Sequence, residues 1–136
     1  MQTLTLYRCL LADRVACGNR DHSSLDCAAE NISMAVLKME TEAERRSLDL
    51  LDIKHLGVIK RMSWAKGETL YCWTFDLDKR GFRGVHRYLA PNLLRAAQML
   101  REDLDNALAG GSRDEGVWMG DVVAVQRGFL CLMAGE

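Results

Sequence analysis

The sequence predicts an α+β domain with a largely antiparallel sheet, built around a central hairpin and packed against two main helices. Three observations carry this prediction. Two runs rich in β-branched and aromatic residues flank a short link that contains glycine. Apolar residues recur at helical spacing in two other segments. Hydrophobic residues make up 49% of the 136 residues, which is ordinary for a globular protein, so we expect one α+β domain spanning 1–136.

The first third of the chain is predicted to hold one strand followed by helices. The strand covers Thr3 to Cys9, and a polar loop runs from Cys17 to Ser24. One of the two serines that end this loop can cap a helix, with Asp26 near the acidic position of a capping box. The apolar stripe of that helix is Leu25, Ala29, Ile32, Val36 and Met39. A second helical segment is predicted over Thr41 to Ile53.

The central hairpin is the clearest strand signal. Val58 to Trp64 and Thr69 to Phe75 are joined by Ala65-Lys66-Gly67, whose glycine suits a turn with positive φ. Pairing across that turn would place alternate residues on a common face, namely Ile59, Arg61, Tyr71, Trp73 and Phe75. The other face would hold Val58, Met62, Trp64, Leu70 and Cys72. A short strand is expected around Val85 to Leu89.

The strongest helix signal follows Pro91, which suits the first turn of a helix. Its buried stripe is predicted to be Leu93, Ala97, Leu100, Leu104, Ala107 and Leu108. Gly110 and Gly111 would end the helix. A C-terminal hairpin is then predicted from Val117–Val125 and Phe129–Met133.

The sequence shows no internal repeat, and we assign it to no family. The predicted middle order, α-β-β-β-α, resembles double-stranded-RNA-binding domains in element order alone. The last helix starts with Asn92, Leu93 and Leu94, so it has no matching basic cluster there.

Composition and targeting signals favour a soluble intracellular protein. No stretch approaches the roughly 18 apolar residues that span a bilayer. Arg8 interrupts the mildly apolar start, and no basic residue precedes it, which argues against a signal peptide. We therefore expect a cytoplasmic protein without membrane contact. The five cysteines are expected to be reduced and mostly buried.

Motifs that would carry chemistry are incomplete. Cys17, His22 and Cys27 have the spacing of part of a zinc knuckle, but Arg14 stands where the remaining cysteine belongs. Structural zinc needs four ligands, so we expect no metal. A nucleophile–base pair such as Cys72 with His86 would have to meet in space. No phosphate-binding glycine loop is present, and no cofactor is expected.

Charge is distributed unevenly along the chain. Residues 53–95 carry 9 basic and 3 acidic side chains, although the whole chain has a formal net charge of −1. Basic residues beside aromatic ones are typical of a surface that binds nucleic acid or an acidic partner. The candidate binding residues are Lys60, Arg61, Lys79, Arg80, Arg83, His86 and Arg87. The alternative is that acidic helices neutralise this segment and that the aromatics are core.

The leading functional prediction is a non-enzymatic interaction or regulatory module that binds another macromolecule, most favourably a protein. Self-association is included, because open sheet edges are commonly covered, and a homodimer is the expected state. A nucleic-acid-binding domain is the first alternative, and a small enzyme of unrecognised type is the second. A chain with so few motifs is also compatible with a phage or mobile-element accessory protein.

Overall fold

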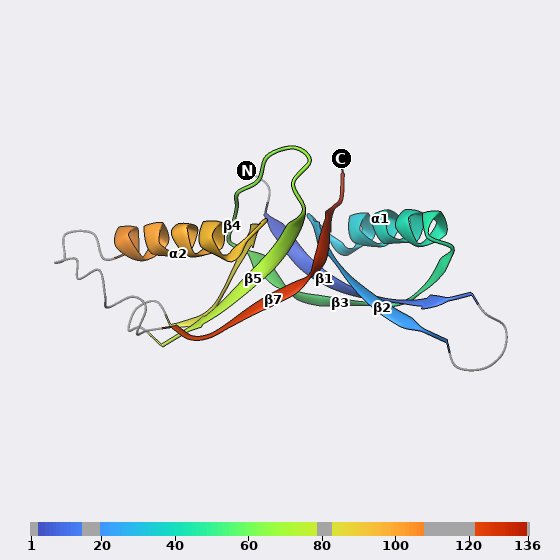
Figure 1. The fold of residues 1–136 in the computed structure, drawn as a ribbon, viewed down its shortest axis with the longest axis horizontal. Helices are drawn as coiled ribbons and strands as arrows, with labels where there is room; N and C mark the ends of the chain where they lie inside the picture. Colours follow the sequence, from blue (N-terminus) through green and yellow to red (C-terminus); the bar gives the residue numbers. More distant parts are fainter. Residues whose placement is uncertain (1–2, 15–19, 79–82, 108–121, 136) are drawn as a thin grey trace. The chain divides into compact units, whose positions relative to one another are not determined.

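The computed structural model describes residues 3–14, 20–78, 83–107 and 122–135 (Figure 1). Within those residues the fold is a mixed α/β structure dominated by strands, with seven strands and two helices. The chain divides into two compact units. Unit 1 consists of residues 1–59 and 129–136, and unit 2 consists of residues 60–128. That the two units form one cooperative domain stays a prediction.

Unit 1 contains β1 (Leu4–Asp13), β2 (His22–Ala29), α1 (Ile32–Arg45), β3 (Leu48–Ile59) and the end of β7 (Val122–Met133). Its strand order is β3-β1-β2-β7. The β1 strand pairs antiparallel with both β2 and β3. The last residues of β7 run parallel to β2.

Helix α1 covers one face of the unit 1 sheet (Figure 1). Because strand side chains alternate between faces, every second residue of β1 and β2 meets the helix. The helix begins where the Asn31 side chain accepts a hydrogen bond from the Met34 amide. The buried core that results is Tyr7, Cys9, Leu11, Leu25, Cys27, Ala29, Ala35, Met39 and Ala43.

The predicted helix boundaries in this unit are wrong. Leu25 to Ala29 belongs to β2, so Asp26 is a strand residue and not a capping acid. The stretch Thr41 to Ile53 contains the end of α1, a break at Ser47 with φ 57°, and the first half of β3. Alanines and spaced leucines fit a helix locally, but pairing with β1 decides the conformation of both stretches.

Unit 2 contains β4 (Arg61–Met62), β5 (Leu70–Leu77), β6 (Gly84–Ala90), α2 (Leu93–Ala107) and the first part of β7. Its strand order is β7-β5-β6-β4. The β5 and β6 strands pair antiparallel, whereas β4 runs parallel to β6. The predicted strand at Val85–Leu89 is confirmed as the middle of β6.

Helix α2 packs over one face of β5 and β6. Leu100 and Leu104 are buried as predicted, but Leu93 is 45% exposed. The buried core is Phe75, Leu77, Tyr88, Ala90, Ala96, Met99, Leu100 and Leu104. The predicted helix end at Leu108, Gly110 and Gly111 lies outside the described residues.

Both predicted hairpins are wrong in their pairing. The link Ala65-Lys66-Gly67 does form a turn, closed by the Glu68 amide donating to the Ala65 carbonyl at 3.0 Å. However, β6 lies between β4 and β5, so the strands beside the turn are not neighbours. At the C-terminus, β7 continues without a turn from Val122 to Met133, so this stretch is one strand and not a hairpin, and residues 117–121 of the predicted first arm lie outside the described residues.

Neither α1 nor α2, the helices of the described residues, is long and apolar enough to cross a membrane.

Candidate functional site

The basic candidate residues that the structure describes all lie in unit 2. They are Lys60, Arg61, Arg83, His86 and Arg87, whereas Lys79 and Arg80 fall outside the described residues. All five lie in or directly beside β4 and β6, but they do not share one face of the sheet.

Arg61 lies on the α2 side of the unit 2 sheet. It pairs in register with Tyr88, a core residue under α2. Its guanidinium donates to Glu102 at 3.0 Å, to Asp103 at 3.1 Å and to the Met99 carbonyl. The Tyr88 hydroxyl donates to the same Asp103 carboxylate at 2.6 Å. The helix carboxylates therefore neutralise Arg61 within its own unit.

Burial also holds this tyrosine in its protonated form. Burial of Tyr88, reinforced by its hydrogen bond to Asp103, raises the pKa of the phenol above its ordinary value. Tyr88 therefore donates this hydrogen bond to Asp103 as a neutral phenol at neutral pH.

Arg87 lies on the opposite face from Arg61, because it is adjacent to Tyr88 in β6 and side chains alternate. His86 shares the α2 face with its register partner Phe75, and its Nδ1 lies 3.5 Å from the Lys60 ammonium. The two arginines of the β4–β6 ladder therefore do not share one surface.

Arg83 forms an exposed ion pair with Asp78 at 2.7 Å. An exposed pair of this kind contributes roughly 0–1 kcal/mol. It nevertheless lowers the net positive charge that Arg83 could offer a phosphate.

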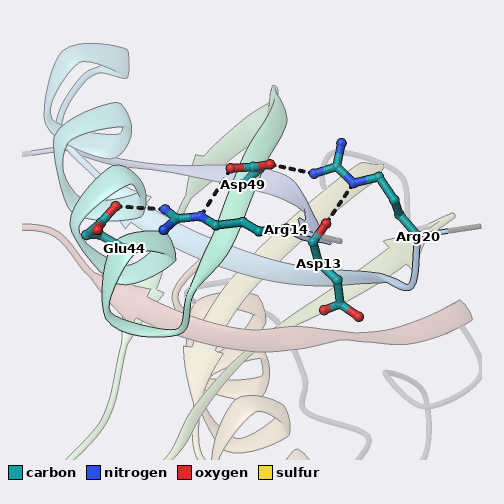
Figure 2. A network of polar contacts seen from close by, with 5 residues as sticks. All are labelled: Asp13, Arg14, Arg20, Glu44 and Asp49. Carbon is teal, nitrogen blue, oxygen red and sulfur yellow. Dashed lines mark hydrogen bonds and ion pairs between the residues drawn. The ribbon is translucent and has the colours of Figure 1, made fainter. Parts of the chain in front are cut away.

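A second polar cluster joins four elements of unit 1 (Figure 2). Arg14 donates to Glu44 at 2.7 Å and to Asp49 at 3.2 Å. Arg20 donates to the other oxygen of Asp49 at 2.5 Å and to the Asp13 carbonyl at 2.7 Å. The cluster ties the end of β1 and the start of β2 to the end of α1 and the start of β3.

The chemistry of this cluster is that of a structural ion-pair network that holds element ends together. The hydrogen bond from Arg14 lowers the pKa of the Glu44 carboxyl below its ordinary value. Its two interacting carboxylates, Glu44 and Asp49, are already paired with guanidinium groups, and the cluster contains no Ser, Cys or Lys nucleophile. No sequence motif predicts this cluster, because its residues are far apart along the chain.

A third set, Arg8, Asp26 and Phe129, surrounds one buried carboxylate in unit 1. Asp26 is 0% exposed, and its two oxygens accept from Arg8 at 2.9 and 3.1 Å. One of these oxygens also accepts from the Phe129 amide at 3.0 Å. The Arg8 guanidinium lies 4.8 Å from the centroid of the Phe129 ring. Sequence reasoning missed this set, because it placed Asp26 at a helix start.

The motif residues considered from the sequence are not brought together. His22 and Cys27 are five positions apart in β2, so they lie on opposite faces, and Cys17 falls outside the described residues. Cys72 and His86 also lie on opposite faces, because His86 pairs with Phe75. Among the described residues, no three His, Cys, Asp or Glu side chains form a group that could hold a metal ion.

A shallow pocket of about 300 Å³ lies on the outer side of α1. It is lined by Met34, Leu37, Lys38 and Thr41 from the helix and by Gly135 near the C-terminus. Leu37 is 70% exposed although it lies in the middle of the helix. The sequence-based search missed this pocket, because Met34 and Leu37 lie outside the predicted apolar stripe.

The comparisons with known proteins give no relative: no family model matches the chain, and neither does a curated protein or a solved structure.

Proposed function

We propose that the protein is a non-enzymatic module that binds another protein through the outer side of α1. The observation that carries this proposal is the pocket beside Leu37. An apolar side chain left 70% exposed in mid-helix, beside a concavity, suits the anchor-and-pocket contacts that dominate protein interfaces.

The lining of the pocket indicates the kind of partner. Met34 and Leu37 offer apolar contact, and methionine adapts its shape to different partners. Lys38 provides one positive charge at the same place. The pocket therefore suits an apolar anchor residue of the partner, with an acidic group beside it.

Nucleic-acid binding stays the alternative, through residues 53–95. Arg87, half-buried on the face of β6 opposite α2, is the residue that favours it. Against it, Arg61 and Arg83 already have carboxylate partners. The formal net charge of −1 also disfavours non-specific binding, which is electrostatic.

The protein-binding proposal is tested by comparing capture of partners by the wild-type chain, Leu37→Glu and Leu94→Glu. Leu94 is 67% exposed on α2 and serves as the matched control. We expect a protein that the wild type and Leu94→Glu retain and that Leu37→Glu loses by about tenfold or more, as for a lost hot spot. Equal retention by all three proteins would refute the proposal. Recovery of this chain itself would identify the partner as a second copy.

A mobility shift tests the nucleic-acid alternative with mixed single- and double-stranded DNA and RNA at about 50 mM salt, where phosphate contacts are strong. We expect no binding tighter than roughly tens of micromolar at this net charge. Submicromolar, salt-sensitive binding that is lost on reversing the charges of Arg80 and Arg83 would establish the alternative instead.

A further inference from the structure

The two halves of the chain repeat the same arrangement of elements. The first half has the order β1-β2-α1-β3, and the second has β5-β6-α2-β7. In each half the first two strands form an antiparallel hairpin. The third strand lies next to the first, giving β3-β1-β2 and β7-β5-β6. We call Leu4–Met62 repeat 1 and Leu70–Met133 repeat 2.

The correspondence extends to single residues where each hairpin leads into its helix. Asn31 and Asn92 each accept a 2.9 Å hydrogen bond from the amide three positions later. The amides of Ala35 and Ala96 donate to the carbonyls of these same asparagines. The same difference in residue number, from 31 to 92 and from 35 to 96, also relates buried residues of α1 to buried residues of α2. These pairs are Met39 with Leu100 and Ala43 with Leu104.

Each repeat also supplies a strand to the other repeat's unit. The end of repeat 1, Arg61–Met62, runs parallel to β6 in unit 2. The end of repeat 2 runs parallel to β2 in unit 1. Equivalent backbone bonds hold both ends, because Ser63 donates to the Leu89 carbonyl and Ala134 to the Ala28 carbonyl. The exchange of strand ends is therefore reciprocal.

We propose that the chain is a duplicated strand-exchanging unit whose repeats also pair with the repeats of a second copy. Two strand pairings would be exchanged: β2 with the end of β7, and β6 with β4. In the dimer, each pairing forms with the matching repeat of the second copy and not with the chain's own other repeat. The same hydrogen bonds form in both cases, so the length of the link between the repeats selects between them. Exchange of identical elements is a low-cost route to a dimer.

The link runs from Trp64 to Thr69 and has little margin for shortening. Its ends, after β4 and before β5, lie on opposite sides of β6, two strand spacings or roughly 10 Å apart. Deleting Trp64–Glu68 leaves Thr69 alone between Ser63 and Leu70. Two residue steps reach at most about 7 Å, so one chain can no longer close on itself.

The deletion of Trp64–Glu68 should convert the protein into a dimer, measured by light scattering after gel filtration. The matched control replaces the same five residues by glycine and serine, which removes the same side chains and keeps the length. We expect this control to keep the oligomeric state of the wild type. A folded, monomeric deletion variant would overturn the proposal.

A cross-link keeps the proposal testable if the deletion variant fails to fold. Ala28 and Met133 are register partners in the pairing of β2 with the end of β7. In a Cys131→Ser background, Ala28→Cys with Met133→Cys is refolded at low and at high protein concentration and then oxidised. We expect covalent dimers on a denaturing gel only from the high concentration.

The matched control for the cross-link is Ala28→Cys with Leu6→Cys, which are register partners within one hairpin. This pair should yield only covalent monomers at both concentrations. If the Ala28/Met133 pair also yields only monomers at both concentrations, the repeats do not exchange with a second copy and the proposal is wrong.

Discussion

Units 1 and 2 share their apolar framework but differ at one position of their hairpins. The second strand of each hairpin ends in an alanine, Ala29 in β2 and Ala90 in β6. The residue three positions earlier is Asp26 in unit 1 and Arg87 in unit 2. Their partners across the hairpin are Arg8 and Thr74. In unit 1 the position holds the fully buried carboxylate of an ion pair with the partly exposed Arg8, whereas Arg87 in unit 2 is half-buried. Unit 1 therefore depends on a polar contact at this position that has no equivalent among the described residues of unit 2.

The largest expected effect is that of Asp26→Ala. It leaves the Arg8 guanidinium and the Phe129 amide without the carboxylate that both contact. Removing this buried carboxylate, which both donors depend on, is expected to cost about 3–5 kcal/mol, measured by urea denaturation. Arg87→Ala is the matched control and should stay within about 0.5 kcal/mol. Similar losses for both variants would remove the asymmetry between the units.

Truncation of the core should affect the two units alike. Leu100→Ala in α2 and Met39→Ala in α1 each empty a fully buried position, at a cost of about 2–5 kcal/mol. If the units form one domain, both variants should unfold in a single transition that moves to lower urea concentration. Two separate transitions, each sensitive to only one variant, would show that the units unfold independently.

The helix caps should contribute smaller and matched amounts. Asn31→Ala and Asn92→Ala each remove one side-chain acceptor from the first turn of a helix. We expect about 1 kcal/mol for each, measured by thermal or urea denaturation, because alanine cannot accept that bond. Asn→Asp at either position keeps an acceptor and should cost less. A loss at only one of the two caps would contradict their equivalence.

The last expected effect is the pH dependence that Glu42 contributes. The hydrogen bond from Arg45, with a second from Arg46, lowers the pKa of this carboxyl from 4.5 to about 2. Because the folded pKa is depressed, the stabilisation is present above pH 4.5 and is lost as the pH falls toward 2. The stability difference between wild type and Glu42→Gln should therefore shrink over that interval in urea denaturation at low salt. Glu40→Gln, an exposed change on the same helix, controls for the loss of a carboxylate.

Local signals predicted elements better than they predicted pairings. Burial of Leu100 and Leu104 and the strand at Val85–Leu89 were predicted correctly, because each depends on periodicity in one segment; the exposed Leu93 of the same predicted stripe was not. The turn at Gly67 was also recognised, and its φ is 91°. What it joins could not be predicted, because the insertion of β6 between β4 and β5 is a long-range event.

The candidate sites show the same limit. The basic residues of 53–95 were identified by composition, but their carboxylate partners Glu102 and Asp103 belong to α2. Asp26 was assigned to a helix cap, because an acid after two serines matches that local pattern. Its ion-pair partner Arg8 lies on β1, far away along the chain, so no local pattern reveals the pair. The repeat was missed for the same reason, because the two halves share strand order and helix caps but no recognisable sequence similarity.

Cys9 and Cys27 are buried beneath α1, so their reaction with a thiol reagent can report local unfolding of unit 1. Burial, with Cys27 nearby, raises the pKa of Cys9 to about 12, and burial raises that of Cys27 to about 11. Only the thiolate reacts with alkylating reagents, so both sulfurs are inert at neutral pH while α1 stays in place. Their alkylation, followed by mass spectrometry, would measure how often this core opens, with no label introduced into the chain.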